Sequence, residues 1–433
     1  MQNQFFMFDM FERKQGQPLM ATRSTPPTAP NTPNYTGPFI TITILFCIFG
    51  FITCLNNALV PQMKSIFDLS YGKAMLTTSA FFLAYLLFSI PTSRLIEVIG
   101  YKRTIVISLF IQVVGAAMFI PAAKMVSFPL FLTAIFVLAA GVTALQTAAN
   151  PYVSILGPEH SAPIRLTLAQ AFNALGQAAG PLVVGWFILT DPAKVATKEA
   201  IAHTVQVPFM AIAGGMLLLG LAVMFTHLPA ISSTRAFRPA TDEDPLLKRS
   251  IWSYRHTVLA TLGIFCYVGV EVTLAGIGIN YFMAQGVSTP KIAGVLVSFY
   301  WLGSLVGRFL GSWLLTFTKS ATLLTIFGFL GVALMLTSMF STGPVAIATL
   351  IFCGFANSIM FPNIFALGIA GLGPMTSKGS GLITTACFGG AVVPPIYGAL
   401  ADKVGIQYAF IVPIFCYLYI SYYGISGHKR RKA

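Results

Sequence analysis

Long apolar runs alternate with short polar segments along almost the whole chain. Twelve of the runs have roughly 20 residues, the length that a helix needs to cross a hydrocarbon core of about 30 Å. The pattern therefore predicts an all-α membrane protein with twelve transmembrane helices. The predicted spans are residues 38–60, 74–93, 104–121, 128–149, 164–190, 208–228, 257–282, 292–315, 323–340, 344–372, 379–401 and 406–424.

One long polar segment divides these runs into two sets of six. Residues 229–256 carry charges of both signs and lose the apolar pattern, which predicts a central cytoplasmic loop between an N-terminal half, 38–228, and a C-terminal half, 257–424. Both halves have an Asn/Pro break late in their fourth run, and such internal repeats are typical of transporters. Residues 1–37 are rich in Pro, Thr and Asn, which predicts a disordered cytoplasmic tail. Residues 425–433 predict a basic cytoplasmic tail.

Composition supports the membrane assignment. Charged residues make up 9% of the chain, against about 25% in soluble proteins, and the mean hydropathy is +0.79. The net charge of +14 would suggest nucleic acid as a partner of a soluble protein. With both termini inside, nineteen Lys and Arg, Arg308 among them, fall on the inner side and seven on the outer side. The charge therefore follows the positive-inside rule, and we expect no nucleic-acid partner.

A set of amide side chains is the strongest candidate for a polar site. Gln170, Asn173 and Gln177 lie three and four residues apart, so they share one face of a helix. Gln146 and Asn150 lie in the preceding run, which must kink or end at Pro151 because proline has no backbone donor. Buried amides need partners, either on neighbouring helices or on a bound polar solute. Several aligned amides favour the solute.

Glu271 is the one acidic residue within the predicted spans. A carboxylate inside the bilayer is costly and indicates function by default. The alternative is a protonated Glu271 that donates a packing hydrogen bond. Asn56 and Asn57 lie side by side in the first span, so they face different directions, and the pattern leaves open which of them lines a cavity.

Several stretches resemble known transporters. TSRLIEVIGYKR resembles the helix 2–3 loop motif of the major facilitator superfamily. More specifically, the chain resembles the L-fucose/proton symporter family and its glucose/galactose transporter branch in FGFITCLNNALVPQMK, GVTALQTAANPYVSILGPE, RLTLAQAFNALGQAAGP, YVGVEV and SFYWLGSLVGRFLGS. The resemblance implies that Asn173 corresponds to the family's sugar-binding Asn. It also implies that the family's two membrane carboxylates are replaced here by Asn57 and Gln146, neither of which can carry a proton.

These features predict a secondary active transporter that imports a neutral hexose by alternating access. Amides suit sugars because each one offers both a donor and an acceptor to hydroxyl groups. We expect substrate-binding residues at Asn57, Gln146, Gln170, Asn173, Asn280 and Asn357. The pattern places no fixed cation in the spans that would pair with an anionic sugar. Together with this, the resemblance to the glucose/galactose transporter branch implies glucose or galactose as substrate, with N-acetylglucosamine and L-fucose as alternatives.

Coupling to an ion gradient depends on Glu271, because it is the carboxylate left in the spans. A symporter would bind a proton or sodium ion there, whereas an uncoupled facilitator would use Glu271 to hold the sugar or a neighbouring helix. We find no enzyme motif, phosphate loop or metal-ligand spacing, so we expect no enzymatic activity and no cofactor. A non-transporting sugar sensor remains an alternative. We further expect a monomer in the cell inner membrane that contacts lipid.

Overall fold

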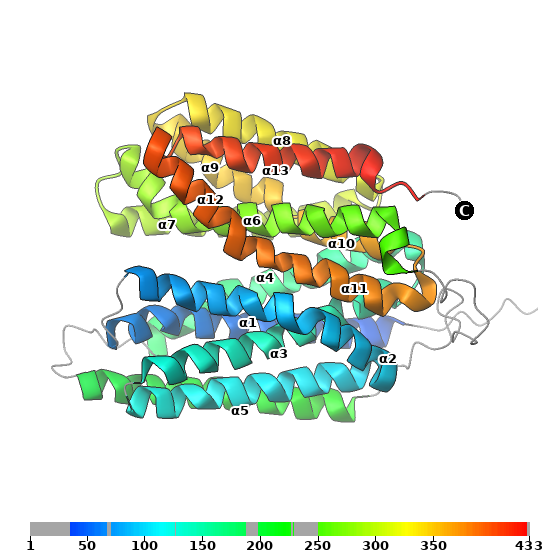
Figure 1. Cartoon of the computed structure of the whole chain (residues 1–433). Helices are drawn as coiled ribbons and strands as arrows, with labels where there is room; N and C mark the ends of the chain where they lie inside the picture. The colour runs from blue at the N-terminus through cyan, green and yellow to red at the C-terminus, as the bar shows by residue number, and fades with distance from the viewer. Residues whose placement is uncertain are drawn as a thin grey trace, which may run out of the picture. The chain divides into compact units, whose positions relative to one another are not determined.

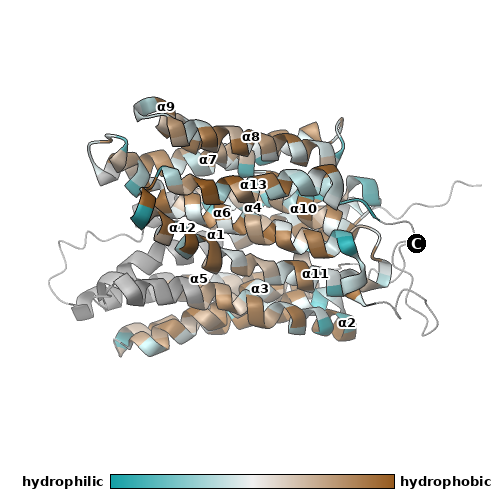
Figure 2. Cartoon of the chain, turned by 45° about the horizontal axis from the view of Figure 1, so that its top comes forward, coloured by the Kyte–Doolittle hydropathy of each residue, from teal (hydrophilic) through white to brown (hydrophobic). Residues whose placement is uncertain are grey.

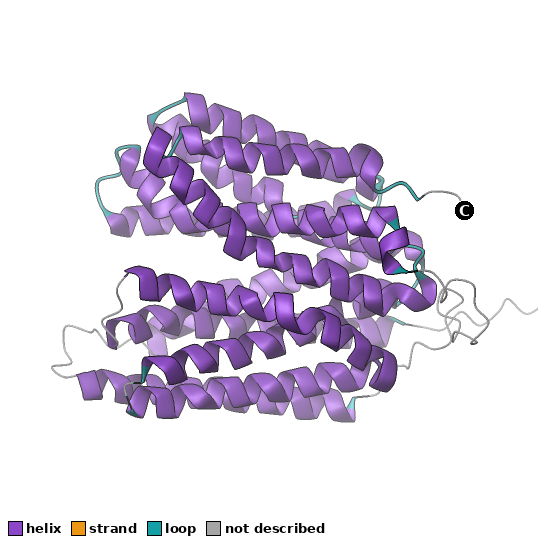
Figure 3. Cartoon of the chain, viewed as in Figure 1, coloured by secondary structure: helices purple, strands orange, loops and turns teal. Residues whose placement is uncertain are grey.

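The computed structural model describes residues 35–66, 71–125, 127–187, 198–226, 228 and 250–430, and for 52–66, 71–79, 179–187, 198–208 and 290–291 it describes the backbone alone. The described chain is helical and contains no strand (Figure 3). Most of the predicted disordered tail and of the predicted central loop lies outside the described residues. The all-α prediction is confirmed.

Apart from a 3₁₀ turn at Glu159–Ser161, the described residues of the N-terminal half form five α-helices. They are α1 (Thr36–Ile66), α2 (Tyr71–Lys124), α3 (Phe128–Ile155), α4 (Ala162–Phe187) and α5 (Lys198–Phe225) (Figure 1). α2 contains both the second and the third predicted span. They meet at Gly100, whose φ of 82° and ψ of 168° turn the chain within a single residue. Glycine adopts this backbone conformation without steric cost.

The described residues of the C-terminal half form the remaining eight α-helices. They are α6 (Arg255–Ala284), α7 (Pro290–Leu314), α8 (Ser320–Phe340), α9 (Gly343–Asn357), α10 (Met360–Ile369), α11 (Thr376–Thr385), α12 (Gly389–Val404) and α13 (Ile411–Tyr422). The tenth predicted span is divided into α9 and α10, and the eleventh into α11 and α12 with a short 3₁₀ turn at Ala386–Phe388.

Hydropathy is distributed as a membrane requires. Eight described helices are long and apolar enough to cross a bilayer, and the described parts of two more, Thr36–Phe51 and Phe209–Phe225, are apolar but shorter. Figure 2 shows hydrophobic residues along the helices and hydrophilic ones gathered toward their ends. Since no water is available in the hydrocarbon region, helices are the means by which this backbone satisfies its polar groups.

The α3 helix does not end at Pro151. It continues for about one more turn, to Ile155, with Pro151 inside the helix. Beyond its end, Arg165 of α4 donates to the backbone carbonyls of Val153 (3.2 Å), Ser154 and Pro158 (3.0 Å). These carbonyls lie at and just beyond the helix C-terminus, and those of Val153 and Pro158 also accept the backbone N–H groups of Leu156 and Ser161. The Arg165 bonds tie the start of α4 to the end of α3.

The two halves meet along specific helix pairs. Within the N-terminal half α1 packs on α4, and α2 packs on α3 and α5. Within the C-terminal half α6 packs on α12, and α7 and α8 pack on α9. Between the halves, α11 contacts α2 and α3, while α4 contacts α7 and α10. The amide-bearing helices α3 and α4 therefore lie at the boundary between the halves.

Candidate functional site

A cavity of about 200 Å³ lies between the two halves. One water molecule needs roughly 10–15 Å³ of such space, so the cavity holds much more than a single water. Its polar lining residues are Gln146, Gln170, Asn173, Gln177, Glu271 and Arg308. Its aromatic lining residues are Phe82, Tyr85, Tyr267, Trp301 and Phe361. The cavity thus combines hydrogen-bonding groups with aromatic faces, as small-molecule sites do.

The amides of α4 form one wall of the cavity, in agreement with their helical spacing. Gln170 Nε2 donates to Asn150 Oδ1 of α3 at 3.1 Å, and Gln177 Nε2 donates to Asn173 Oδ1 at 2.7 Å. Asn173 Nδ2 donates to the Phe46 carbonyl of α1 at 3.0 Å. These amides therefore hold helices together and line the cavity at the same time.

Close contact between α1 and α4 makes the Asn173 bond possible. A Cβ atom added at Gly50 of α1 would collide with the Asn173 carbonyl, and one at Gly176 of α4 would collide with the Cys47 carbonyl. Glycine at both positions lets the two backbones touch. The short Asn173 side chain then reaches across to α1.

An ion pair forms the opposite wall. Glu271 Oε1 of α6 lies 3.9 Å from Arg308 Nη2 of α7, and the two side chains are 19% and 11% exposed. Tyr267, one turn before Glu271, donates its hydroxyl to Glu271 Oε1 at 2.8 Å. Arg308 Nη1 also donates to the Gln170 carbonyl across the boundary between the halves, at 3.2 Å. Arg308 therefore contacts the carboxylate of one half and the backbone of the other.

Arg308 corrects two sequence-based expectations. The charge count placed Arg308 on the inner side, but it lies within α7 and lines the cavity. The expectation that the spans hold no fixed cation is therefore wrong. An Arg inside the apolar run 292–315 was itself the signal, because charged residues in a span mark functional sites. Removing Arg308 from the inner count leaves the inward bias of charge intact.

The other predicted site residues lie elsewhere or outside the described side chains. The Asn57 side chain is not described. Asn280 is exposed near the end of α6 and is not among the cavity-lining residues. Asn357 is fully buried in the C-terminal half. Its Nδ2 donates to the Tyr300 hydroxyl at 2.8 Å and its Oδ1 accepts from the Tyr417 hydroxyl at 2.7 Å. Asn357 thus serves helix packing in this structure, and neither it nor Asn280 is brought to the cavity.

No group of three or more His, Cys, Asp or Glu side chains in the described residues is arranged to hold a metal ion. The described part of the cavity holds a single carboxylate, Glu271, beside a single guanidinium. Their formal charges cancel. What the cavity can do is bind a polar, uncharged molecule between amides, aromatic rings and one ion pair.

Comparison with known proteins agrees with this arrangement. Residues 41–393 match the model of the Major Facilitator Superfamily. The chain is 42% identical to the glucose/galactose transporter of Brucella abortus over 407 residues, which covers 92% of this chain and 95% of that protein. It is 33% identical to the L-fucose-proton symporter of Escherichia coli over 408 residues, which covers 89% of this chain and 92% of that protein.

A solved structure gives the same result for the fold. The structure of FucP in the outward conformation, a Major Facilitator Superfamily transporter, matches with a TM-score of 0.82 and 32% identity, over 90% of this chain and 98% of that one. The predicted resemblance and the prediction of a transporter without enzymatic activity are both confirmed. The chain is a multi-pass membrane transporter and belongs to the Major Facilitator Superfamily.

Proposed function

We propose that the protein imports a neutral hexose by alternating access through the cavity between its halves. The observation that carries this proposal is the lining of the cavity, in which four amides face one ion pair and several aromatic rings. Amides donate to and accept from sugar hydroxyls, and aromatic rings cover the C–H surface of the sugar. Because the charges of Glu271 and Arg308 cancel, the cavity favours an uncharged substrate.

Glucose or galactose is the first candidate substrate. The relatives in Brucella abortus and Helicobacter pylori, the latter 37% identical over 402 residues, carry the names glucose/galactose transporter and putative glucose/galactose transporter. N-acetylglucosamine and L-fucose remain the alternatives, and the relative in Escherichia coli is named an L-fucose-proton symporter. Uptake into proteoliposomes across a panel of these sugars tests the ranking. A product chemically different from the added sugar would contradict transport itself.

We propose that cation coupling takes place at Glu271, with a proton or a sodium ion. A cation bound there would remove the negative partner of Arg308, which would keep its bond to the Gln170 carbonyl. The loading of Glu271 would then alter a contact between the halves. Moving one charge down 100 mV supplies about 2.3 kcal/mol, which is sufficient to drive accumulation.

An uncoupled facilitator is the second candidate, and the same ion pair supports it. A Glu271 that stays paired with Arg308 needs no cation, and would only position the sugar or α7. Glu271→Gln distinguishes the two candidates when it is assayed for sugar counterflow and for gradient-driven uptake. Lost uptake with intact counterflow supports coupling at Glu271. Undiminished gradient-driven accumulation in Glu271→Gln contradicts it.

We also propose a membrane location, an orientation and an oligomeric state for the transporter. The inward excess of Lys and Arg supports cytoplasmic termini and an inner-membrane location, with the basic tail beside anionic lipid. We propose that the transporter functions as a monomer, because the two halves of one chain together supply the amides, the ion pair and the aromatic rings of the cavity.

A further inference from the structure

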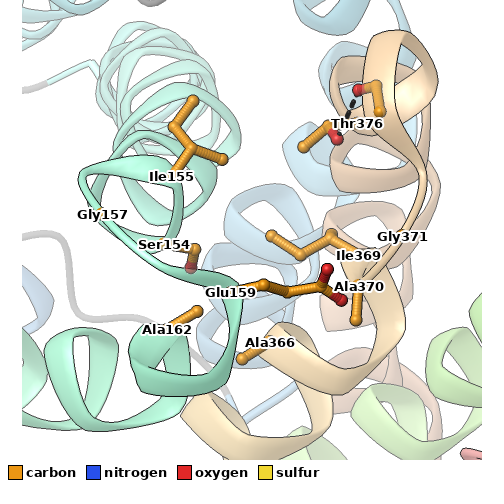
Figure 4. A pocket seen from close by; sticks show the side chains of 11 residues that line it. Ser154, Ile155, Gly157, Glu159, Ala162, Ala366, Ile369, Ala370, Gly371 and Thr376 are labelled. Carbon is orange, nitrogen blue, oxygen red and sulfur yellow. Dashed lines mark hydrogen bonds between the residues drawn. The ribbon is translucent and has the colours of Figure 1, made fainter. Parts of the chain in front are cut away.

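A second pocket lies on the boundary between the halves, at the end of α3 (Figure 4). This inner pocket has a volume of about 240 Å³. Ser154 and Glu159 line it from the N-terminal half, and Ala370 and Thr376 from the C-terminal half. Arg430 of the basic segment that follows the C-terminal half forms an ion pair with Glu159 beside it. The positive-inside count assigns this end of the molecule to the cytoplasm.

The same two helices lead from the central cavity to the inner pocket. On α3, Gln146 lines the cavity and Ser154 lines the inner pocket. Eight residues of helix separate them, which corresponds to about 12 Å. On the facing segment, Thr376 at the start of α11 lines the inner pocket, and Cys387 in the 3₁₀ turn that follows α11 lines the cavity. α3 and α11 pack against each other between these points.

Buried polar side chains recur along both helices in this region. Five of these residues are called the seam below. They are Thr143, Thr147 and Asn150 of α3 and Ser380 and Thr384 of α11. On each helix they recur at intervals of three or four residues, so each set shares one face. All five are fully buried. A permanent contact between the halves would be more stable with apolar residues, because buried polar groups need hydrogen-bond partners.

Proline explains one bond of the seam. Pro151 has no backbone N–H, so the carbonyl of Thr147, four residues earlier, loses its helical partner. Ser380 Oγ of the other half donates to that carbonyl at 2.7 Å. A carbonyl released by proline in the N-terminal half is therefore satisfied by a hydroxyl of the C-terminal half. This bond exists only while the two halves are together.

Three other polar atoms of the seam have no protein partner. Thr143 Oγ1, Asn150 Nδ2 and Thr384 Oγ1 are buried and make no hydrogen bond within the described chain. A buried polar group without a partner costs roughly 1–3 kcal/mol. Their missing hydrogen bonds raise the free energy of the closed state relative to a state in which water or a sugar hydroxyl reaches them. Nine buried side-chain atoms of this kind occur in the described residues, and three of them belong to the seam.

We propose that the seam is the closed inner section of the substrate path. When the halves separate, the Ser380–Thr147 bond breaks, the central cavity joins the inner pocket, and Thr143, Asn150 and Thr384 hydrogen-bond to water and to the hydroxyls of the passing sugar. The inference rests on the proposed function of sugar transport. It adds which side chains line the exit and names one bond that helps to hold it shut.

Thiol labelling at Thr384→Cys tests the proposal. The six native cysteines are replaced first, in a background shown to fold and to insert into the membrane. A membrane-impermeant maleimide is then added to the cytoplasmic face of inside-out vesicles without sugar. Ser380→Ala removes the donor that holds the closed state, so labelling should become roughly tenfold faster. The control is Ser421→Ala, a buried serine whose Oγ donates to the Tyr417 carbonyl of its own helix at 2.9 Å, and it should leave the rate unchanged.

Thr143→Val should act in the opposite direction. Valine has nearly the shape of threonine and removes a hydroxyl that has no partner in the closed state but gains one in the open state. Labelling of Thr384→Cys should therefore become roughly tenfold slower. The control is Thr133→Val, which lies on the same helix but is exposed. Equal rates in all variants, or a shift in the same direction for Ser380→Ala and Thr143→Val, would overturn the proposal.

The assay separates this inference from the proposed function. Labelling at rest requires no sugar, so the expected shifts without uptake of any tested hexose would contradict the substrate and support the seam. Normal hexose uptake with no detectable labelling of Thr384→Cys would contradict the seam and support the substrate.

Discussion

At the residue scale, Asn173 already has protein partners on both polar atoms of its side chain. Its Nδ2 donates to the Phe46 carbonyl and its Oδ1 accepts from Gln177. A sugar that binds Asn173 must therefore add to these bonds or replace one of them. Each carbonyl and amide oxygen has two lone pairs, so Asn173 Oδ1 can accept a sugar hydroxyl beside Gln177.

Asn173→Ala should weaken sugar binding by about 1–3 kcal/mol, because it removes a cavity hydrogen bond and leaves partners unpaired. Binding of radiolabelled hexose to purified protein measures the effect. Gln146→Ala should act similarly, since Gln146 also lines the cavity. Asn280→Ala is the control. It should bind sugar normally, because Asn280 is exposed and does not line the cavity. Wild-type affinity in both cavity variants would show that the sugar binds elsewhere.

Arg308 and Glu271 should depend on each other for stability. Arg308→Gln leaves a partly buried carboxylate without its cation, which we expect to cost about 3 kcal/mol of unfolding free energy, the low end of the cost for a buried pair. Adding Glu271→Gln should restore most of the loss, because two neutral side chains need no ion pair. Thermal unfolding in detergent measures all three variants. Additive losses in the double variant would show that the two side chains do not interact energetically.

At the element scale, glycine and proline decide where helices approach and where their backbone groups become available. Gly176 lets α4 touch α1, and Pro151 releases a carbonyl of α3 at the boundary between the halves. Both effects concern backbone atoms, so they act on whole helices. The packing of α1, α3 and α4 around the cavity therefore depends on residues that do not themselves face a sugar.

Gly176→Ala should destabilise the protein by roughly 1–3 kcal/mol, because its Cβ would collide with the Cys47 carbonyl and push α1 from α4. Gly276→Ala is the matched control. It lies inside α6, and an added methyl group would meet no atom within 4 Å, so alanine should be neutral or stabilise the helix by up to about 1 kcal/mol. Thermal stability in detergent compares the two. Equal stability of the two variants would mean that α1 and α4 can move apart at little cost in free energy.

At the scale of the whole molecule, transport requires that the halves exchange one set of contacts for another. On the side of the inner pocket the halves are joined by Ser380 to the Thr147 carbonyl, by Ser377 to Glu97 at 3.0 Å and by Arg430 to Glu159. At the level of the cavity, Arg308 joins them through the Gln170 carbonyl. These are polar contacts that can be exchanged for contacts with water at low cost, as alternating access requires.

The ratio of internal to external sugar shows whether the transport cycle moves net charge across the membrane. If one cation travels with each sugar, a potential of 100 mV should support roughly 50-fold accumulation in proteoliposomes, since it supplies about 2.3 kcal/mol. An ionophore that collapses the potential should remove it. Internal sugar that only equals external sugar, with or without the potential, would identify a facilitator.

The sequence by itself determined the membrane architecture, because the thickness of the bilayer acts on each apolar run separately. It also determined that Gln170, Asn173 and Gln177 share a face, since helix periodicity is a local property. Only the tertiary structure decided what each face meets. It placed Arg308 opposite Glu271, kept Asn357 between two tyrosines, and brought Ser380 to the carbonyl that Pro151 releases. Those contacts join residues far apart in the chain, and the packing of neighbouring helices selects them.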